Sequence, residues 1–135
     1  MKLKYLTYYD YMDVYYAKNH PDAVQTSDSG KRVSLAGHKR WWSNFRRSAL
    51  NGFLGIYENG EFAGYARFQH TGNNECELSW FLYPKFRGNG YAAKAIEKII
   101  KDKSGRKFKA RIKKDNKPSL KLANKFLEIR IEVLD

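Results

Sequence analysis

The chain has 135 residues, which is enough for one packed core and too few for two, so we expect a single domain over residues 1–135. Hydrophobic residues make up 42% and aromatic residues 16%, which excludes a disordered chain, and no apolar run approaches the roughly 18–20 residues of a membrane span. The net charge of +12 favours an anionic partner, while the single cysteine, Cys76, excludes an internal disulfide and a cysteine-rich metal site.

The first fifty residues predict one short strand followed by two helices. The strand covers Lys2 to Thr7, and the first helix runs from Asp10 to Asn19. The second helix covers Leu35 to Arg47, with Ser34 as its N-cap, because a serine hydroxyl accepts a hydrogen bond from the first turn. Residues 22–33, between the two helices, are polar and are expected to form a loop.

The middle of the chain predicts three antiparallel strands. Phe53 to Tyr57 and Phe62 to Gln69 flank the pair Asn59-Gly60, which is a strong hairpin signal between two apolar runs. A second turn leads into the third strand, from Glu75 to Tyr83.

The last third of the chain predicts helices alternating with strands. A helix from Ala92 to Lys103 precedes a strictly alternating strand from Phe108 to Lys113. A last helix, Asn116 to Leu127, leads into a final strand from Glu128 to Leu134. The order is therefore β-α-α-β-β-β-α-β-α-β, a mixed α/β fold. The helix from Ala92 to Lys103 connects the strand that ends at Tyr83 to the strand that begins at Phe108. This connection implies that the two strands are parallel, with a right-handed crossover.

The junction between the strand ending at Tyr83 and the helix beginning at Ala92 is the most informative segment. Its two glycines leave backbone N–H groups uncovered, and the helix N-terminus adds the positive end of a dipole, so the segment predicts an anion site. Its letters also match the dinucleotide pattern G-x-G-x-x-A. However, a hairpin precedes the loop and only about 40 residues follow it, which disfavours a Rossmann fold. No Gly-Lys-Ser/Thr follows, which excludes a Walker-type loop.

Two motifs in this region resemble those of a known family. Arg87, Gly90 and Ala92 form the pattern Arg-x-x-Gly-x-Ala, which resembles the coenzyme A signature of the GNAT superfamily of acyl-CoA-dependent N-acetyltransferases. Asn116 and Ser119, after the next strand, look like the Asn-x-x-Ser opening of the family's fourth helix. Together the two motifs and the element order make the resemblance specific.

The resemblance implies a GNAT-like fold in which different parts of the chain bind the two substrates. The expected sheet is mixed, mostly antiparallel and twisted, with a splayed parallel strand pair and flanking helices. Residues 51–135 would form the acyl-CoA-binding core, and residues 1–50 would supply the acceptor-side helices. The implied reaction moves an acetyl group from acetyl-CoA, the co-substrate, to a primary amine by direct attack, without a metal.

The resemblance also assigns binding roles to three groups of residues. Main-chain groups of the strand before the loop would hold the pantetheine arm: Phe81, Leu82 and Tyr83. The loop and the first turn of the helix would hold the pyrophosphate: Arg87, Gly88, Asn89, Gly90, Tyr91 and Ala92. The opening of the fourth helix would contact the pantetheine arm from the other side: Asn116 and Ser119.

The chemistry requires a base, because free amines have pKa values of roughly 8–10 and the attacking amine must be neutral. Glu77 is predicted as this base, since many family members carry a catalytic glutamate on the strand that enters the loop. Glu75 faces the same way by the strand period of two, but lies nearer the turn. A tyrosine that commonly protonates the leaving thiolate falls, in the family, where this chain has Ala123, so the general acid is unassigned.

The acceptor side offers a shorter resemblance. Ser34, His38 and Trp41 are similar to a segment of GNAT enzymes that acetylate nucleotide-linked amino sugars, which predicts His38 and Trp41 as acceptor-binding residues and an anionic acceptor. Residues 94–125 hold 13 Lys/Arg against 3 Asp/Glu, so a protein, peptide or aminoacyl-tRNA acceptor stays open. A non-catalytic nucleic-acid-binding module is disfavoured, because the aromatic residues are not interleaved with the basic stretch.

The remaining expectations concern location and assembly. The first residues lack the apolar stretch of a signal peptide, and with one cysteine a cytoplasmic location is expected. No membrane partner is expected, and the chain is predicted to act as a monomer or a homodimer.

Overall fold

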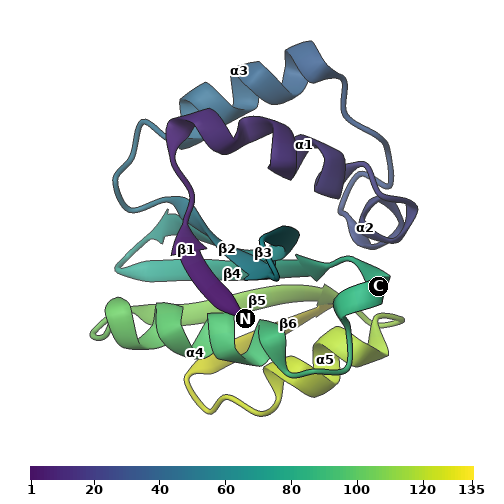
Figure 1. The fold of residues 1–135 in the computed structure, drawn as a ribbon. Helices are drawn as coiled ribbons and strands as arrows, with labels where there is room; N and C mark the ends of the chain where they lie inside the picture. The colour runs from purple at the N-terminus through teal and green to yellow at the C-terminus, as the bar shows by residue number, and fades with distance from the viewer.

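A computed structural model describes all residues from 1 to 135 as one six-stranded sheet with helices on both faces (Figure 1). The strands lie side by side in chain order: β1 (Lys2–Tyr5), β2 (Gly52–Glu58), β3 (Glu61–Gly72), β4 (Glu75–Leu82), β5 (Lys107–Lys113) and β6 (Ile129–Leu134). The N-terminal helices cover one face: η1 (Tyr8–Asp10), α1 (Tyr11–Lys18), α2 (Pro21–Thr26) and α3 (Leu35–Phe45). The later helices lie on the other side: α4 (Tyr91–Asp102) and α5 (Lys117–Ala123), with η2 (Pro84–Phe86) leading into α4.

The sheet has an antiparallel half and a parallel half, as predicted. β1 to β4 pair antiparallel, and the β2–β3 turn holds Asn59 and Gly60 at positive φ, the conformation that a tight hairpin requires. β4 to β6 pair parallel, with α4 as the crossover between β4 and β5. β4 and β5 pair only at their first residues, the last pair being Glu77 with Lys109. Beyond that pair the two strands diverge, which confirms the splayed pair of the expected fold.

Two apolar clusters hold the helices to the sheet. On one face, α4 turns Ala95, Ile96 and Ile99 toward Leu78 and the other apolar side chains of the central strands. On the opposite face, α1 and α3 pack against an aromatic cluster centred on Phe53. Side chains alternate between the faces along β4, so that strand contributes to both cores. The cleft between β4 and β5 therefore lies between two well-packed layers.

The structure differs most from the predicted elements at one unpredicted helix and one helix end. The segment predicted as a polar loop contains α2, because Pro21 starts a helix at a position that needs no backbone N–H and the His20 ring accepts a hydrogen bond from the Asp22 N–H. The last helix ends at Ala123, four residues before its predicted end. None of the helices is both long and apolar enough to cross a bilayer.

Candidate functional site

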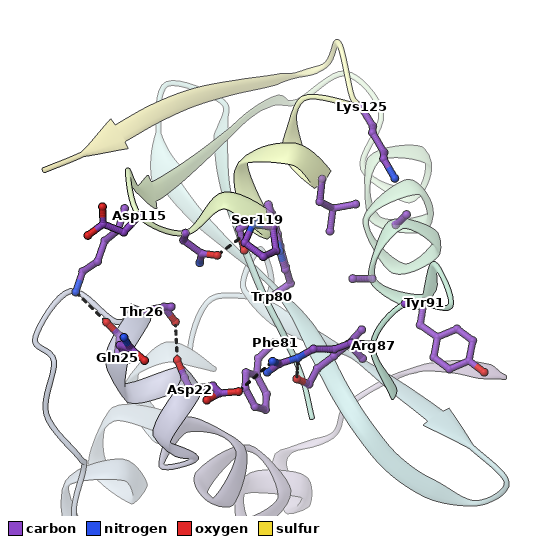
Figure 2. Close-up of a pocket in the computed structure, with 18 of the residues that line it drawn as sticks. Asp22, Gln25, Thr26, Trp80, Phe81, Arg87, Tyr91, Asp115, Ser119 and Lys125 are labelled. Atoms are coloured by element: carbon purple, nitrogen blue, oxygen red, sulfur yellow. Dashed lines mark hydrogen bonds and ion pairs between the residues drawn. The ribbon is translucent and has the colours of Figure 1, made fainter. Parts of the chain in front are cut away.

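A cavity of about 720 Å³ opens where β4 and β5 diverge (Figure 2). Its walls come from the end of β4, the loop between η2 and α4, the start of α5 and the exposed side of α2. The volume is in the range of pockets that bury a cofactor-sized ligand. The cavity therefore lies beside the loop that the sequence predicts as an anion site.

The loop presents a run of free donors to this cavity. Gly88 and Gly90 have φ values of 85° and 75°, which favour glycine, and a Cβ on either residue would meet no atom within 4 Å. The backbone N–H groups from Gly88 to Ala93 have no acceptor within the protein. Six consecutive unpaired amides at the start of a twelve-residue helix form a cradle for a phosphate group, because the helix dipole favours negative charge there.

Arg87, before the cradle, is held by two contacts. Its Nε donates to the Leu82 carbonyl at 2.9 Å, and a terminal nitrogen donates to the Asp22 carboxylate at 3.0 Å. Both side chains of this ion pair are nearly half exposed. Figure 2 shows the pair at one edge of the cavity, with Ser119 on the far side. A ligand diphosphate would compete with Asp22 for this guanidinium.

Asn116 approaches the cavity from the start of α5. Its side-chain oxygen caps the helix by accepting the Ser119 N–H at 3.3 Å. Its amide nitrogen donates no hydrogen bond within the chain and is free for a ligand carbonyl. The predicted Asn-x-x-Ser motif thus fixes one end of the Asn116 side chain and leaves the other end available.

The structure gathers most of the predicted donor-binding residues around this cavity. Nine of the eleven line it: Phe81, Leu82, Arg87, Gly88, Gly90, Tyr91, Ala92, Asn116 and Ser119. Tyr83 lies instead against the rings of His20 and Phe81. The Asn89 side chain turns back to the Phe86 carbonyl.

The sequence missed the contribution of α2 to the site. Asp22, Gln25 and Thr26 line the cavity, and the Lys113 ammonium donates to the Gln25 carbonyl at 3.2 Å. The sequence feature that could have predicted α2 is Pro21 followed by Asp22, since proline and an acidic residue are common in the first turn of a helix. Nothing in the local sequence indicates that this helix lines the cavity.

The two candidate carboxylates on β4 differ in how firmly they are held. Arg130 and then Lys109, with Thr71, hydrogen-bond the Glu75 carboxylate and lower its pKa from the ordinary 4.5 to about 2. Glu75 is therefore a carboxylate whose negative charge is stabilised by the two basic side chains that contact it. Glu77 lies at the point where β4 and β5 separate. Its one ion pair, with Arg67, is long at 3.8 Å, and its side chain keeps 16% of its surface exposed.

The predicted acceptor residues lie in the layer formed by α1 and α3. His38 is 1% exposed, its Nε2 bonds the Tyr11 carbonyl at 2.8 Å, and burial lowers the pKa of its ring. Trp41 is half-buried, stacks on Phe45 at 4.7 Å and carries the Lys18 ammonium 3.7 Å from its ring centroid. His38 is thus a packing residue inside the helical layer. Trp41 is partly exposed, and the Lys18 ammonium lies over its ring.

The position of the missing tyrosine does not face the cavity in this chain. Ala123 is fully buried at the end of α5 and is not one of the lining residues. Tyr91 lines the cavity, but its hydroxyl is hydrogen-bonded to Glu58, which raises the pKa of Tyr91. No His, Cys, Asp or Glu side chains gather in a group of three that would hold a metal ion.

Comparisons with known proteins agree with this geometry. Residues 1–126 match the family model described as an acetyltransferase (GNAT) domain. A ribosomal-protein-alanine N-acetyltransferase from Brucella melitensis is similar in fold, with 22% identity, a TM-score of 0.76 and coverage of 93% of this chain and 82% of that one. A Salmonella typhimurium protein solved with its cofactor acetyl-CoA has 21% identity and a TM-score of 0.78, and the match covers 93% of this chain and 77% of that one. An N-acetyltransferase from Staphylococcus aureus has 21% identity and a TM-score of 0.77, and the match covers 93% of this chain and 81% of that one. A comparison with curated protein sequences finds no match.

Proposed function

The chain belongs to the GNAT acetyltransferase family and is an acetyl-CoA-dependent N-acetyltransferase, and we propose that a primary amine attacks the thioester directly in the cleft between β4 and β5. The observation that carries this proposal is the row of six unpaired amides, Gly88 to Ala93, on the wall of a cavity large enough for the donor. These amides fit a diphosphate, and the free amide nitrogen of Asn116 fits a carbonyl of the pantetheine arm.

Glu77 is the base in this proposal. The amine gives up a proton to the carboxylate, directly or through one water, as its nitrogen bonds to the carbonyl carbon of the thioester. The tetrahedral intermediate then collapses, the C–S bond breaks and coenzyme A leaves as the thiolate. No side chain is needed to protonate it, since thiols ionise at a pKa of about 8.5. Glu77 does not line the cavity itself, but it lies at the last β4–β5 pair before the strands separate and has no close ion pair, which supports this role.

The acceptor in this proposal is an anionic primary amine, with a nucleotide-linked amino sugar as the first candidate. The surplus of basic residues supports an anionic acceptor. His38 is buried and cannot contact an acceptor directly, so the support for an anionic acceptor comes from the net charge of the chain. A protein, peptide or aminoacyl-tRNA acceptor is the alternative, and steep salt dependence with RNA would favour the last of these.

The test is thiol release from acetyl-CoA across a panel of amines, followed by Glu77→Gln on the best acceptor. We expect kcat to fall by about 100-fold or more, the usual contribution of a general base, with an altered pH dependence. The acetyl-CoA Kd, measured by calorimetry, should not change. Glu75→Gln, two residues away on the same face, is the matched control and should keep turnover. A Glu77→Gln enzyme with wild-type kcat would remove Glu77 from the mechanism, and silence across the panel would remove the activity.

A further inference from the structure

Three charged side chains meet on the face of the sheet that α1 and α3 cover. Lys18 ends α1, Arg67 lies in the middle of β3, and Glu77 lies on β4. All three are partly buried, and the side chains of Arg67 and Glu77 keep 24% and 16% of their surface exposed. The group therefore joins two cations to one carboxylate at the edge of the acceptor-side layer.

Neither cation is fully paired. The Arg67–Glu77 contact is 3.8 Å, longer than a hydrogen bond, and the buried Arg67 Nε has no acceptor. Lys18 has no carboxylate within 4.0 Å of its ammonium, which lies over the Trp41 ring at 3.7 Å. Burial first, and the charge of Arg67 second, lower the pKa of Lys18 to about 8. The group of Lys18, Arg67 and Glu77 therefore has two positive charges and only one negative charge.

Two cations of β5 on the same side of the sheet are, by contrast, paired with carboxylates. Lys109 contacts Glu75 at 3.1 Å, and Arg111 contacts Asp28 at 2.9 Å. Partly buried charges without a close counter-ion are costly, which makes such groups candidates for binding a ligand of opposite charge. The cation–π contact to Trp41 positions the ammonium of Lys18 but brings no negative charge.

We propose that Lys18 and Arg67 form an oxyanion subsite, which binds the carboxylate or phosphate of an acidic acceptor and sets its amine beside Glu77. This inference rests on the proposed function, and it narrows the acceptor to a class. The short reach from Arg67 to Glu77 requires the acid group of the acceptor to lie a few bonds from the reacting amine. The partly exposed guanidinium of Arg67 and the ammonium of Lys18 both carry N–H donors, so charge-assisted hydrogen bonds hold the acid group.

Matched acceptor pairs test the subsite. Each amine is offered with and without its acid group: α-amino acids against their amides, and amino-sugar phosphates against the free amino sugars. We expect the acidic member to have at least about tenfold higher kcat/KM, because a hydrogen bond to a charged group discriminates by that much. The amino-acid pair reports a carboxylate subsite, and the sugar pair reports a phosphate subsite. Equal kcat/KM within both pairs would overturn the inference and leave the acetyltransferase activity standing.

Two variants address the residues themselves. Lys18→Met keeps an apolar stem on Trp41, and Arg67→Gln keeps a hydrogen-bonding group on β3. Each should cut the preference for the acidic member to below about threefold, through KM for that member. An unchanged acetyl-CoA Kd shows that the variant is folded. Lys39→Met is the matched control, since Lys39 lies over the Tyr11 ring at 5.6 Å in the same layer and should keep the full preference.

A direct binding measurement separates this inference from the proposed function. Protein saturated with coenzyme A, so that the cradle at Gly88 to Ala93 is filled, is titrated with inorganic phosphate and with acetate, and tryptophan fluorescence is recorded. We expect a saturable change from Trp41 with at least one of the two anions, lost in Lys18→Met and kept in Lys39→Met. No saturable change with either anion would overturn the subsite. If no amine is acetylated, the proposed function fails and this titration alone decides the subsite.

Discussion

The donor side and the acceptor side of the cleft are built from different parts of the chain. On the proposed donor side, one continuous run from Gly88 to Ala93 has unpaired backbone N–H groups, and all of its residues except Asn89 line the cavity. On the proposed acceptor side, the charged groups are side chains of Lys18, Arg67 and Glu77, which come from three elements far apart in the sequence. A diphosphate cradle needs only local backbone geometry, whereas an acceptor subsite needs long-range packing.

This difference predicts separate effects for changes on the two sides. Donor-side changes should alter the acetyl-CoA Kd whatever the acceptor, and acceptor-side changes should alter the acceptor KM alone. A donor-side change that altered only the acceptor KM would break the division.

The largest binding effect is expected for Gly88→Ala. The φ of 85° at Gly88 disfavours a side chain, and the new methyl group would enter the space that a diphosphate needs. We expect the acetyl-CoA Kd to rise at least about tenfold, which corresponds to ~1.4 kcal/mol, measured by calorimetry. Gly60→Ala is the matched control, because Gly60 has a φ of 78° with open space around it but lies in the β2–β3 turn. If both variants raise the Kd alike, the effect is backbone strain and not loss of the cradle.

A smaller, opposite effect is expected for Asp22→Asn. The carboxylate holds Arg87 at 3.0 Å and adds negative charge to the lining of the cavity. Exposed ion pairs are worth ~0.2–1 kcal/mol, so freeing Arg87 should tighten acetyl-CoA binding by at most about fivefold. Glu61→Gln, which breaks the exposed pair with Lys85 away from the cavity, should leave the Kd unchanged. Weaker binding in Asp22→Asn would mean that Asp22 orients Arg87 for the ligand.

The element order was readable from the sequence because its signals are local. Asn59-Gly60 marks the hairpin, and the helix from Ala92 shows its apolar face at helical spacing, so these elements and the parallel crossover are confirmed. α2 was missed because a six-residue helix with little apolar periodicity gives no such signal. Its contacts with Arg87 and Lys113 are long-range and appear only in the folded chain.

Within the candidate site, too, some residues were predicted from local sequence signals and others were not. The motif around Arg87 predicted most of the cavity wall, since glycines at a strand-to-helix turn imply uncovered amides. Lys18 carries no comparable signal, because a lysine in the last turn of a helix is ordinary. Arg67 reads as one polar residue on a strand, and its unpaired Nε depends on what packs around it. Side-chain environments of this kind follow from tertiary packing, which no local pattern encodes.

The smallest expected effect lies where the two sides meet, at the closed end of the cleft. Glu75 joins β4 to Lys109 on β5 and to Arg130 on β6, and these contacts lower its pKa from 4.5 to about 2. Because the folded state holds the carboxylate ionised, this stabilisation is complete above the unfolded pKa and is lost as the pH falls through the folded one. Glu75→Gln should therefore lower the urea midpoint at pH 7, and the gap from wild type should close between pH 4.5 and about 2.

Circular dichroism during urea unfolding at several pH values measures this gap, with Glu128→Gln as the control, since Glu128 forms no ion pair. A gap that stays constant with pH would assign the loss to packing instead of charge. Glu75 does not line the cavity, so the acetyl-CoA Kd of Glu75→Gln at pH 7 should match that of wild type. A changed Kd would show that the closed end of the cleft sets the separation of β4 and β5, so that the donor side also depends on a long-range contact.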